Sequence, residues 1–241
     1  MIGACRQMKS ENSFFQSLVH LFFPHLCCGC GTDLLAENDL FCIYCRADMP
    51  VTCFEFFPSN PIEKIFWGRS EIQAAAAHLY FTSGSIVQHS LHLLKYRGRK
   101  EIGVYFGEQM GKQLIHSRRF DDCDIIIPLP LFTEREKKRG YNQATMIAKG
   151  VSRHLKIPVV SDAVCRVKKT ETQTHKSRIE RWQNMKSTFS ISDPEKICGK
   201  HVLLVDDVVT TGASLEACAQ VILDTPGLRI SIACLAHTVN A

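Results

Sequence analysis

The residues best suited to chemistry follow an apolar run late in the chain. The apolar run at 201–205 is followed by two carboxylates, Asp206 and Asp207. A small, hydroxyl-rich loop then leads into an apolar helical pattern. Backbone N–H groups at a helix start are unsatisfied and carry the positive end of the dipole, so they suit a phosphate. The carboxylates can accept hydrogen bonds from the hydroxyls of an attached sugar. We therefore predict a ribose 5-phosphate site whose phosphate is held by Thr210, Thr211, Gly212, Ala213 and Ser214.

Other nucleotide-binding loops do not match this segment. The chain has neither GxxxxGK[ST] nor GxGxxG, which excludes a P-loop and a dinucleotide-binding fingerprint. A phosphorylated receiver domain would carry paired acidic residues after its first strand, but too little chain follows residue 207 to complete that fold. The structural alternative is a strand–turn–helix corner whose carboxylates only cap a helix. The order of residue types along the loop favours the phosphate site.

A second group of chemical interest is two Cys-x-x-Cys pairs near the amino terminus. The pairs are separated by 11 residues, and each can form a tight turn in which both thiolates face one ion. Four thiolates are the soft ligands of a closed, structural zinc site, and the short spacer still allows a two-stranded ribbon. Reduced thiols without metal are the alternative, and Cys28 is a spare thiol. The predicted zinc ligands are Cys27, Cys30, Cys42 and Cys45.

Composition supports a globular protein of the reduced cytoplasm. Hydrophobic residues make up 45% of the 241 and charged residues 22%, and no apolar run is long enough to span a membrane. Seven of the 12 cysteines lie in the first 53 residues, and such clustering favours a metal site over disulfides. Residues 1–60 carry three basic and six acidic side chains, a net charge of −3. Because the whole chain has a net charge of +5, residues 61–241 have a net charge of +8. We therefore predict a cytoplasmic protein whose main domain binds anions.

Apolar strand-like runs alternate with helical patterns through most of the chain. The runs are continuous rather than alternating, which is typical of a buried, mostly parallel sheet covered by helices. The expected fold is a doubly wound α/β domain at 59–241, preceded by a helix and zinc ribbon module at 1–58. Predicted strands lie at 72–81, 124–131, 157–167, 201–207 and 230–238, and predicted helices at 13–23, 85–96, 101–116, 142–155 and 214–224. A connector at 53–68 and a basic turn after residue 131 have no clear period.

Several motifs resemble those of type I phosphoribosyltransferases. The segment VLLVDDVVTTGAS is similar to their motif for binding phosphoribosyl diphosphate (PRPP), and the segment at 128–144 resembles P-x-P-L…R…RG[FY]NQ[AS]. A third segment, T-x-x-Q…R-x-x-N…F, matches at Thr170, Gln173, Arg181, Asn184 and Phe189. Together with the cysteine pairs, these motifs identify the chain as a member of the ComF/GntX group, the competence-associated branch of that superfamily.

The resemblance implies roles for particular residues. Asp206 and Asp207 would hold the ribose hydroxyls of PRPP, whose diphosphate carries Mg²⁺, and Arg135 and Arg139 would bind the diphosphate. The stretch 166–186 has seven basic and two acidic side chains and lies where the superfamily has a mobile loop. Lys168 and Lys169 would reach the leaving diphosphate from that loop, so they are predicted as catalytic residues together with the two aspartates. A solvated basic loop without this role is the alternative.

Two functions of different classes follow from the resemblance. In the first, the protein is an enzyme that transfers ribose 5-phosphate from PRPP to an acceptor, which no segment of the sequence identifies. In the second, it is a non-catalytic accessory protein of natural transformation that senses a nucleotide or binds single-stranded DNA. Basic clusters at 95–100, 135–139 and 166–186 would contact the DNA backbone in that case, beside the competence machinery.

Overall fold

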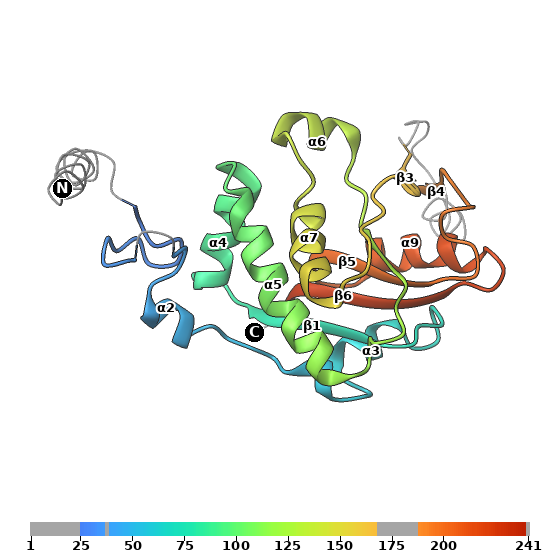
Figure 1. The fold of residues 1–241 in the computed structure, drawn as a ribbon, viewed down its shortest axis with the longest axis horizontal. Coiled ribbons are helices and arrows are strands. Elements are labelled where there is room, and N and C mark those ends of the chain that lie inside the picture. The colour runs from blue at the N-terminus through green and yellow to red at the C-terminus, as the bar shows by residue number, and fades with distance from the viewer. Residues whose placement is uncertain (1–24, 37–38, 168–187, 240–241) are drawn as a thin grey trace, which may run out of the picture. The chain divides into compact units, whose positions relative to one another are not determined.

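The computed structural model describes residues 25–36, 39–167 and 188–239, which fall into two compact units (Figure 1). The first unit extends to Met49 and the second begins at Pro50. The domain boundary predicted after residue 58 stays a prediction. The predicted helix at 13–23 and most of the basic stretch at 166–186, including Lys168 and Lys169, lie outside the described residues.

A four-stranded parallel sheet forms the centre of the second unit. Its order is β1-β6-β5-β2, and every neighbouring pair is parallel. The strands are β1 (Ala75–Phe81), β2 (Ile125–Pro128), β5 (His201–Val209) and β6 (Arg229–Thr238). Most residues of these strands are buried, which explains their continuous apolar sequences. The predicted α/β fold with a mostly parallel sheet is confirmed.

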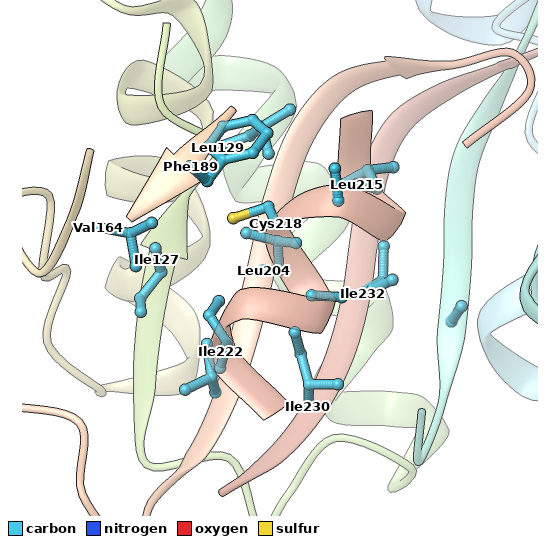
Figure 2. Close-up of a cluster of buried hydrophobic side chains, with 14 of the residues drawn as sticks. Ile127, Leu129, Val164, Phe189, Leu204, Leu215, Cys218, Ile222, Ile230 and Ile232 are labelled. Atoms are coloured by element: carbon cyan, nitrogen blue, oxygen red, sulfur yellow. The ribbon is translucent and has the colours of Figure 1, made fainter. Parts of the chain in front are cut away.

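Helices cover both faces of this sheet. On one face, α9 (Ala213–Leu223) places Leu215, Cys218 and Ile222 on the side chains of β5 and β6 (Figure 2). Figure 1 shows the helices of the other face, which are α4 (Ile86–Tyr96), α5 (Lys100–Ser117) and α7 (Gln143–Leu155). Leu203 and Val205 of β5, which alternate with the residues facing α9, are also fully buried. The sheet is therefore doubly wound, as predicted.

The helices α5 and α7 pack closely because glycine lies at their contact. A Cβ atom at Gly107 would lie 2.1 Å from the carbonyl oxygen of Ile147, and one at Gly150 would lie 2.2 Å from that of Val104. No side chain fits at either position without separating the two backbones. Since α7 also contacts β2 and β5, this packing fixes the helix that follows the β2 connection.

Three segments differ from the expectations. The connector contains a 3₁₀ helix, η1 (Phe54–Phe56), and an α-helix, α3 (Pro61–Phe66). Helix α3 begins with Pro61, a residue favoured at the first helical position, and the side chain of Asn60 caps it by accepting hydrogen bonds from two backbone N–H groups of the first turn. The basic turn is a helix, α6 (Thr133–Arg139), which ends at Gly140.

The third difference is the predicted strand at 157–167, which divides into two parts. Val159 forms a single parallel bridge to β2, and β3 (Val164–Arg166) leaves the main sheet to pair antiparallel with β4 (Phe189–Ile191). A uniform apolar pattern does not reveal that the chain changes pairing partner within the run. In the part of the chain that the structure describes, no helix is long and apolar enough to cross a membrane.

Candidate functional site

The sheet brings the ends of two strands together at its carboxyl edge. Pro128 of β2 is in register with Val205 of β5, and the N–H of Leu129 donates to the carbonyl of Val205 over 2.8 Å. β5 continues past this point to Val209, so the connection to α6 leaves the sheet near Asp206, before the loop to α9 begins. Ligands of open α/β sheets bind outside the carboxyl ends of such strands.

The loop after β5 encloses a small cavity at the start of α9. Gly212 precedes α9 with a left-handed φ of 72°, and as a glycine it has no side chain to cap this helix start. A Cβ atom at Gly212 would lie 2.6 Å from Cγ2 of Ile65. The cavity has a volume of about 110 Å³ and is lined by Asp206, Val208, Val209, Thr210, Thr211, Gly212, Ala213, Ser214 and Leu215. The predicted phosphate-loop residues therefore surround one space at a helix amino terminus, where an anion is stabilised.

Arg69, which follows α3, supports this loop from outside the cavity. Its Nη2 lies 2.6 Å from Oε2 of Glu216, a buried carboxylate in the first turn of α9. Its other terminal nitrogen, Nη1, lies 3.5 Å from the carbonyl oxygen of Thr211. One guanidinium therefore links α3, the loop and α9, and it opposes a shift of the loop relative to the helix.

The two aspartates at the end of β5 have different partners. Asp207 is buried, and its Oδ2 lies 2.7 Å from Nζ of Lys95 at the end of α4. Asp206 is partly buried and accepts a hydrogen bond of 2.8 Å from the backbone N–H of Asp207. Burial raises the pKa of Asp206 well above its usual value, and the charge of Asp207 raises it further. Lys95 and Arg166 offset part of this effect.

Arg166, at the end of β3, adds a cation close to Asp206. Its guanidinium lies 4.0 Å from the ring centre of Phe132 and 5.1 Å from that of Phe189. Burial lowers the pKa of Arg166, the charge of Arg135 lowers it further, and Asp206 acts in the opposite sense. The guanidinium is therefore held by two aromatic rings within the electrostatic range of both the aspartate and α6.

Helix α6 carries the two arginines predicted to bind diphosphate. Arg139 stacks on the ring of Tyr96 at 5.6 Å and donates a hydrogen bond to Gln143. A cavity of about 500 Å³ lies beside this helix, lined by Lys95, Tyr96, Gly98, Arg135, Lys138 and Arg139. Since Lys95 also contacts Asp207, this basic cavity adjoins the aspartates at the end of β5.

The other residues of the RGYNQ segment position this helix. Gly140 ends α6 with a left-handed φ of 81°, and the Tyr141 hydroxyl donates to the carbonyl of Leu94 in α4. Asn142 accepts the N–H of Ala144 at the start of α7 and donates to the carbonyl of Leu129, both at 2.9 Å. The segment therefore ties the connection after β2 to α4 and α7.

Sequence reasoning missed three cations of this site. In the sequence, Lys95 is only part of a basic cluster and Arg166 is only the start of a basic stretch, and no pattern indicates Arg69. The ends of the stretch that contains Lys168 and Lys169 are joined by the pairing of Arg166 with Phe189. The catalytic and binding roles assigned to residues from the sequence remain predictions.

The four predicted zinc ligands lie together in the first unit. One ligand atom from each of Cys27, Cys30, Cys42 and Cys45 lies within 4.8 Å of all the others. The Sγ atoms of Cys30 and Cys42 are 3.7 Å apart, close to the roughly 3.8 Å between two sulfurs of a tetrahedral site with Zn–S bonds of about 2.3 Å. The donor set therefore fits zinc.

The backbone around this cluster favours a thiolate at Cys27, whereas burial and the neighbouring thiols raise the pKa of Cys45. N–H groups of Gly29 and Cys42 donate to Sγ of Cys27 over 3.4 Å and 3.2 Å. Burial acts to raise the pKa of Cys27, but the backbone hydrogen bonds outweigh it and lower the pKa to about 6. Within 25–36 and 39–49, the cluster rests on turns and on the short helix α2 (Ile43–Ala47), with no strand of the expected ribbon.

Comparisons with known proteins agree with this architecture. Residues 142–240 match the family model described as the phosphoribosyl transferase domain. The chain is 34% identical over 152 residues to the DNA utilization protein YhgH of Shigella flexneri, a match that covers 62% of this chain and 66% of the relative. It is 44% identical over 94 residues to Competence protein F of Haemophilus influenzae, covering 39% of this chain and 41% of the relative.

A third relative is Competence protein ComFC of Bacillus subtilis, 28% identical over 145 residues that cover 60% of this chain and 56% of the relative. Among solved structures, adenine phosphoribosyltransferase from Saccharomyces cerevisiae is 16% identical with a TM-score of 0.36, covering 61% of this chain and 73% of that one. Residues 142–240 are thus similar to a phosphoribosyl transferase domain. The chain's relatives are the competence and DNA utilization proteins, as its motifs predicted.

Proposed function

We propose that the protein binds PRPP together with Mg²⁺ and transfers its ribose 5-phosphate to an acceptor. The observation that carries this proposal is the start of α9 at Gly212, a glycine with no side chain to cap the helix, shortly after the two aspartates of β5. A phosphate in the cavity would meet the N–H groups of α9 and the hydroxyls of the loop. A ribose attached to it would extend toward Asp206 and Asp207.

Charge around the site suits a diphosphate leaving group. Arg135, Arg139 and Lys95 line the adjoining basic cavity, and guanidinium groups can bind two phosphate oxygens at once. As the bond to diphosphate breaks, C1 of the ribose gains cationic character, and the nearby carboxylates stabilise that charge. Mg²⁺ bound to the diphosphate supplies further charge neutralisation when it is present. Lys168 and Lys169 would act on the same leaving group.

The first test is ligand stabilisation of the purified protein. PRPP with Mg²⁺ at 100 times its dissociation constant should stabilise the fold by about 2.7 kcal/mol, seen as a thermal shift. Asp206→Ala combined with Asp207→Ala should abolish the shift, whereas Asp193→Ala, a surface carboxylate paired with Lys196, should keep it. No shift with millimolar PRPP, where a known phosphoribosyltransferase responds, would disprove the proposal. Diphosphate release across purine, pyrimidine and nicotinate acceptors then identifies the substrate.

A second candidate function is nucleotide sensing or single-stranded DNA binding without transfer. The names of the relatives favour it, as do Lys137 and Lys138, which are exposed on α6 beside the two arginines. Affinity for an oligonucleotide would fall with salt at a slope of about −0.7 per phosphate contact. A fluorescence titration at two salt concentrations, with and without PRPP, distinguishes the functions. Absence of binding at low salt leaves the transferase alone.

We also propose that Cys27, Cys30, Cys42 and Cys45 hold one structural Zn²⁺ and that the protein works in the cytoplasm. Four sulfur ligands leave no open position for a substrate, which supports a structural role. A reducing compartment keeps the thiols available to the metal. Elemental analysis of protein purified without chelators tests the zinc, and fractionation of cells tests the location.

A further inference from the structure

A second cluster of metal-binding side chains lies at the opposite end of β5 from the phosphate loop. His201 is the first residue of β5, and Asp122 and Cys123 lie in the turn before β2. One ligand atom from each lies within 4.8 Å of the other two. From His201 to Val209 the strand extends roughly 26 Å at about 3.3 Å per residue, so this cluster is separate from the PRPP site.

The histidine has the surroundings of a metal ligand. His201 is 1% exposed, and its Nδ1 has no hydrogen-bond partner among the described residues. The same Nδ1 nevertheless lies 3.1 Å from Oδ1 of Asp122. The two atoms form an ion pair when the ring is protonated, and a metal ion bound between them would take the place of that proton. Their separation is close to the roughly 3.3 Å between nitrogen and oxygen ligands of a tetrahedral zinc ion.

Neighbouring groups hold each member of the cluster in place. Nε2 of His201 lies 2.9 Å from the hydroxyl of Ser231 in β6, so this contact orients the ring with Nδ1 toward Asp122. The second carboxylate oxygen of Asp122 accepts a hydrogen bond of 2.6 Å from Arg229. Metal-binding histidines and carboxylates usually make a second hydrogen bond of this kind, which fixes their direction.

We propose that Asp122, Cys123 and His201 form a binding site for a divalent transition metal, with Zn²⁺ as its first occupant. Cys123 is buried, whereas the Asp122 side chain is 56% exposed, so the fourth position faces solvent and can take a water molecule. On binding, a metal–sulfur bond forms and the Cys123 thiol releases its proton to solvent. One thiolate and one carboxylate neutralise the double charge of the ion.

Such a metal would join three separate segments of the fold. Its ligands come from the start of β5 and the turn before β2, and Ser231 brings in β6. We therefore expect the metal to stabilise the amino edge of the sheet. Binding would not depend on PRPP, because the phosphate loop lies at the other edge.

Metal content of the full chain, measured by elemental analysis without chelators, is the first test. Cys123→Ser should remove one equivalent of zinc relative to the unsubstituted protein. Cys218→Ser, which changes another fully buried thiol, should not remove it. The equivalent lost with Cys123→Ser should remain in a Cys42→Ser protein, which separates this site from the cysteine cluster. Metal content that Cys123→Ser leaves unchanged would overturn the proposal.

Titration with Co²⁺ gives a second test, whose main variant changes an exposed ligand. Asp122→Asn alters an exposed ligand and should weaken binding. Arg229→Gln removes the hydrogen bond that orients the same carboxylate and should also weaken it, whereas Arg153→Gln, at a surface pair with Glu108, should leave binding unchanged. Ser231→Ala should weaken it by roughly 10–100-fold through loss of orientation. Equal Co²⁺ affinity in the Asp122→Asn and unsubstituted proteins would contradict the site.

Discussion

The cysteine cluster and the phosphate loop are both built on turns, but their parts come together differently. All four thiols of the cluster lie between residues 27 and 45, and their sulfurs face one another. The loop at 210–214 instead depends on groups from distant elements. Arg69 supports it from beside α3, and Lys95 and Arg166 set the charge around its aspartates.

The two regions therefore respond differently to substitution. A cluster whose ligands are close in sequence gains most of its order from the bound ion, so damage stays within one unit. The phosphate loop is supported by side chains from several elements. Substitution of one of these side chains should alter ligand binding without unfolding the sheet. Four substitutions, taken from the largest expected effect to the smallest, test this difference.

Replacing one zinc ligand should have the largest and most local effect. We expect Cys42→Ser to remove the zinc of the cluster and the local order of residues 25–50, because three sulfurs no longer close the site. PRPP binding should stay within error of the unsubstituted protein. Elemental analysis, amide hydrogen exchange and the PRPP thermal shift measure these three quantities. Loss of the thermal shift would show that the two regions are coupled.

Gly212→Ala should abolish PRPP binding. The added Cβ would meet Ile65 at 2.6 Å in a left-handed backbone, so the loop must change shape. Gly227→Ala is the matched control, because its φ is 76° and its Cβ would meet only Gly199 at 3.7 Å. Both variants should lose about 1–2 kcal/mol of stability from backbone strain, measured by urea unfolding. If both kept the PRPP thermal shift, the loop would not be the phosphate site.

Asp206→Asn should change how stability depends on pH. Because the pKa of Asp206 is raised in the folded protein, the folded state keeps a proton that the unfolded state has already lost. Stability therefore falls as pH rises from the usual aspartate pKa to the raised one. The Asp206→Asn protein has no titrating group at this position, so its stability does not fall in this way. Its free energy of unfolding, relative to that of the unsubstituted protein, should therefore be more favourable at pH 8 than at pH 4. A constant difference across that range would contradict the raised pKa.

Arg69→Met should have the smallest effect. The substitution removes the contacts to Glu216 and Thr211 that hold the loop. PRPP binding should therefore weaken by roughly five- to tenfold, about 1–1.4 kcal/mol. Arg153→Met, which removes a surface pair with Glu108, is the control and should leave affinity unchanged. Isothermal titration compares the two. Equal affinities would mean that the packing of Gly212 alone holds the loop.

Local signals predicted much of this protein correctly. Apolar runs located the main strands within a few residues, and Ser85 and Asn142 cap α4 and α7 where the helical patterns begin. The connector was harder, although Asn60 followed by Pro61 carried the signal for α3. The run at 157–167 could not be divided from its sequence, because the pairing partner of β3 lies beyond residue 188.

The sequence by itself determined the features in which neighbouring residues suffice. These are the cysteine spacing, the order of residue types after β5, and the continuous apolar strands that require a sheet covered on both faces. Only the tertiary structure decided which distant charges meet. The contacts of Lys95 with Asp207, Arg69 with Glu216, and Asp122 with His201 each join separate elements. Their spacing along the chain carries no period, because strand order and helix packing alone bring them together.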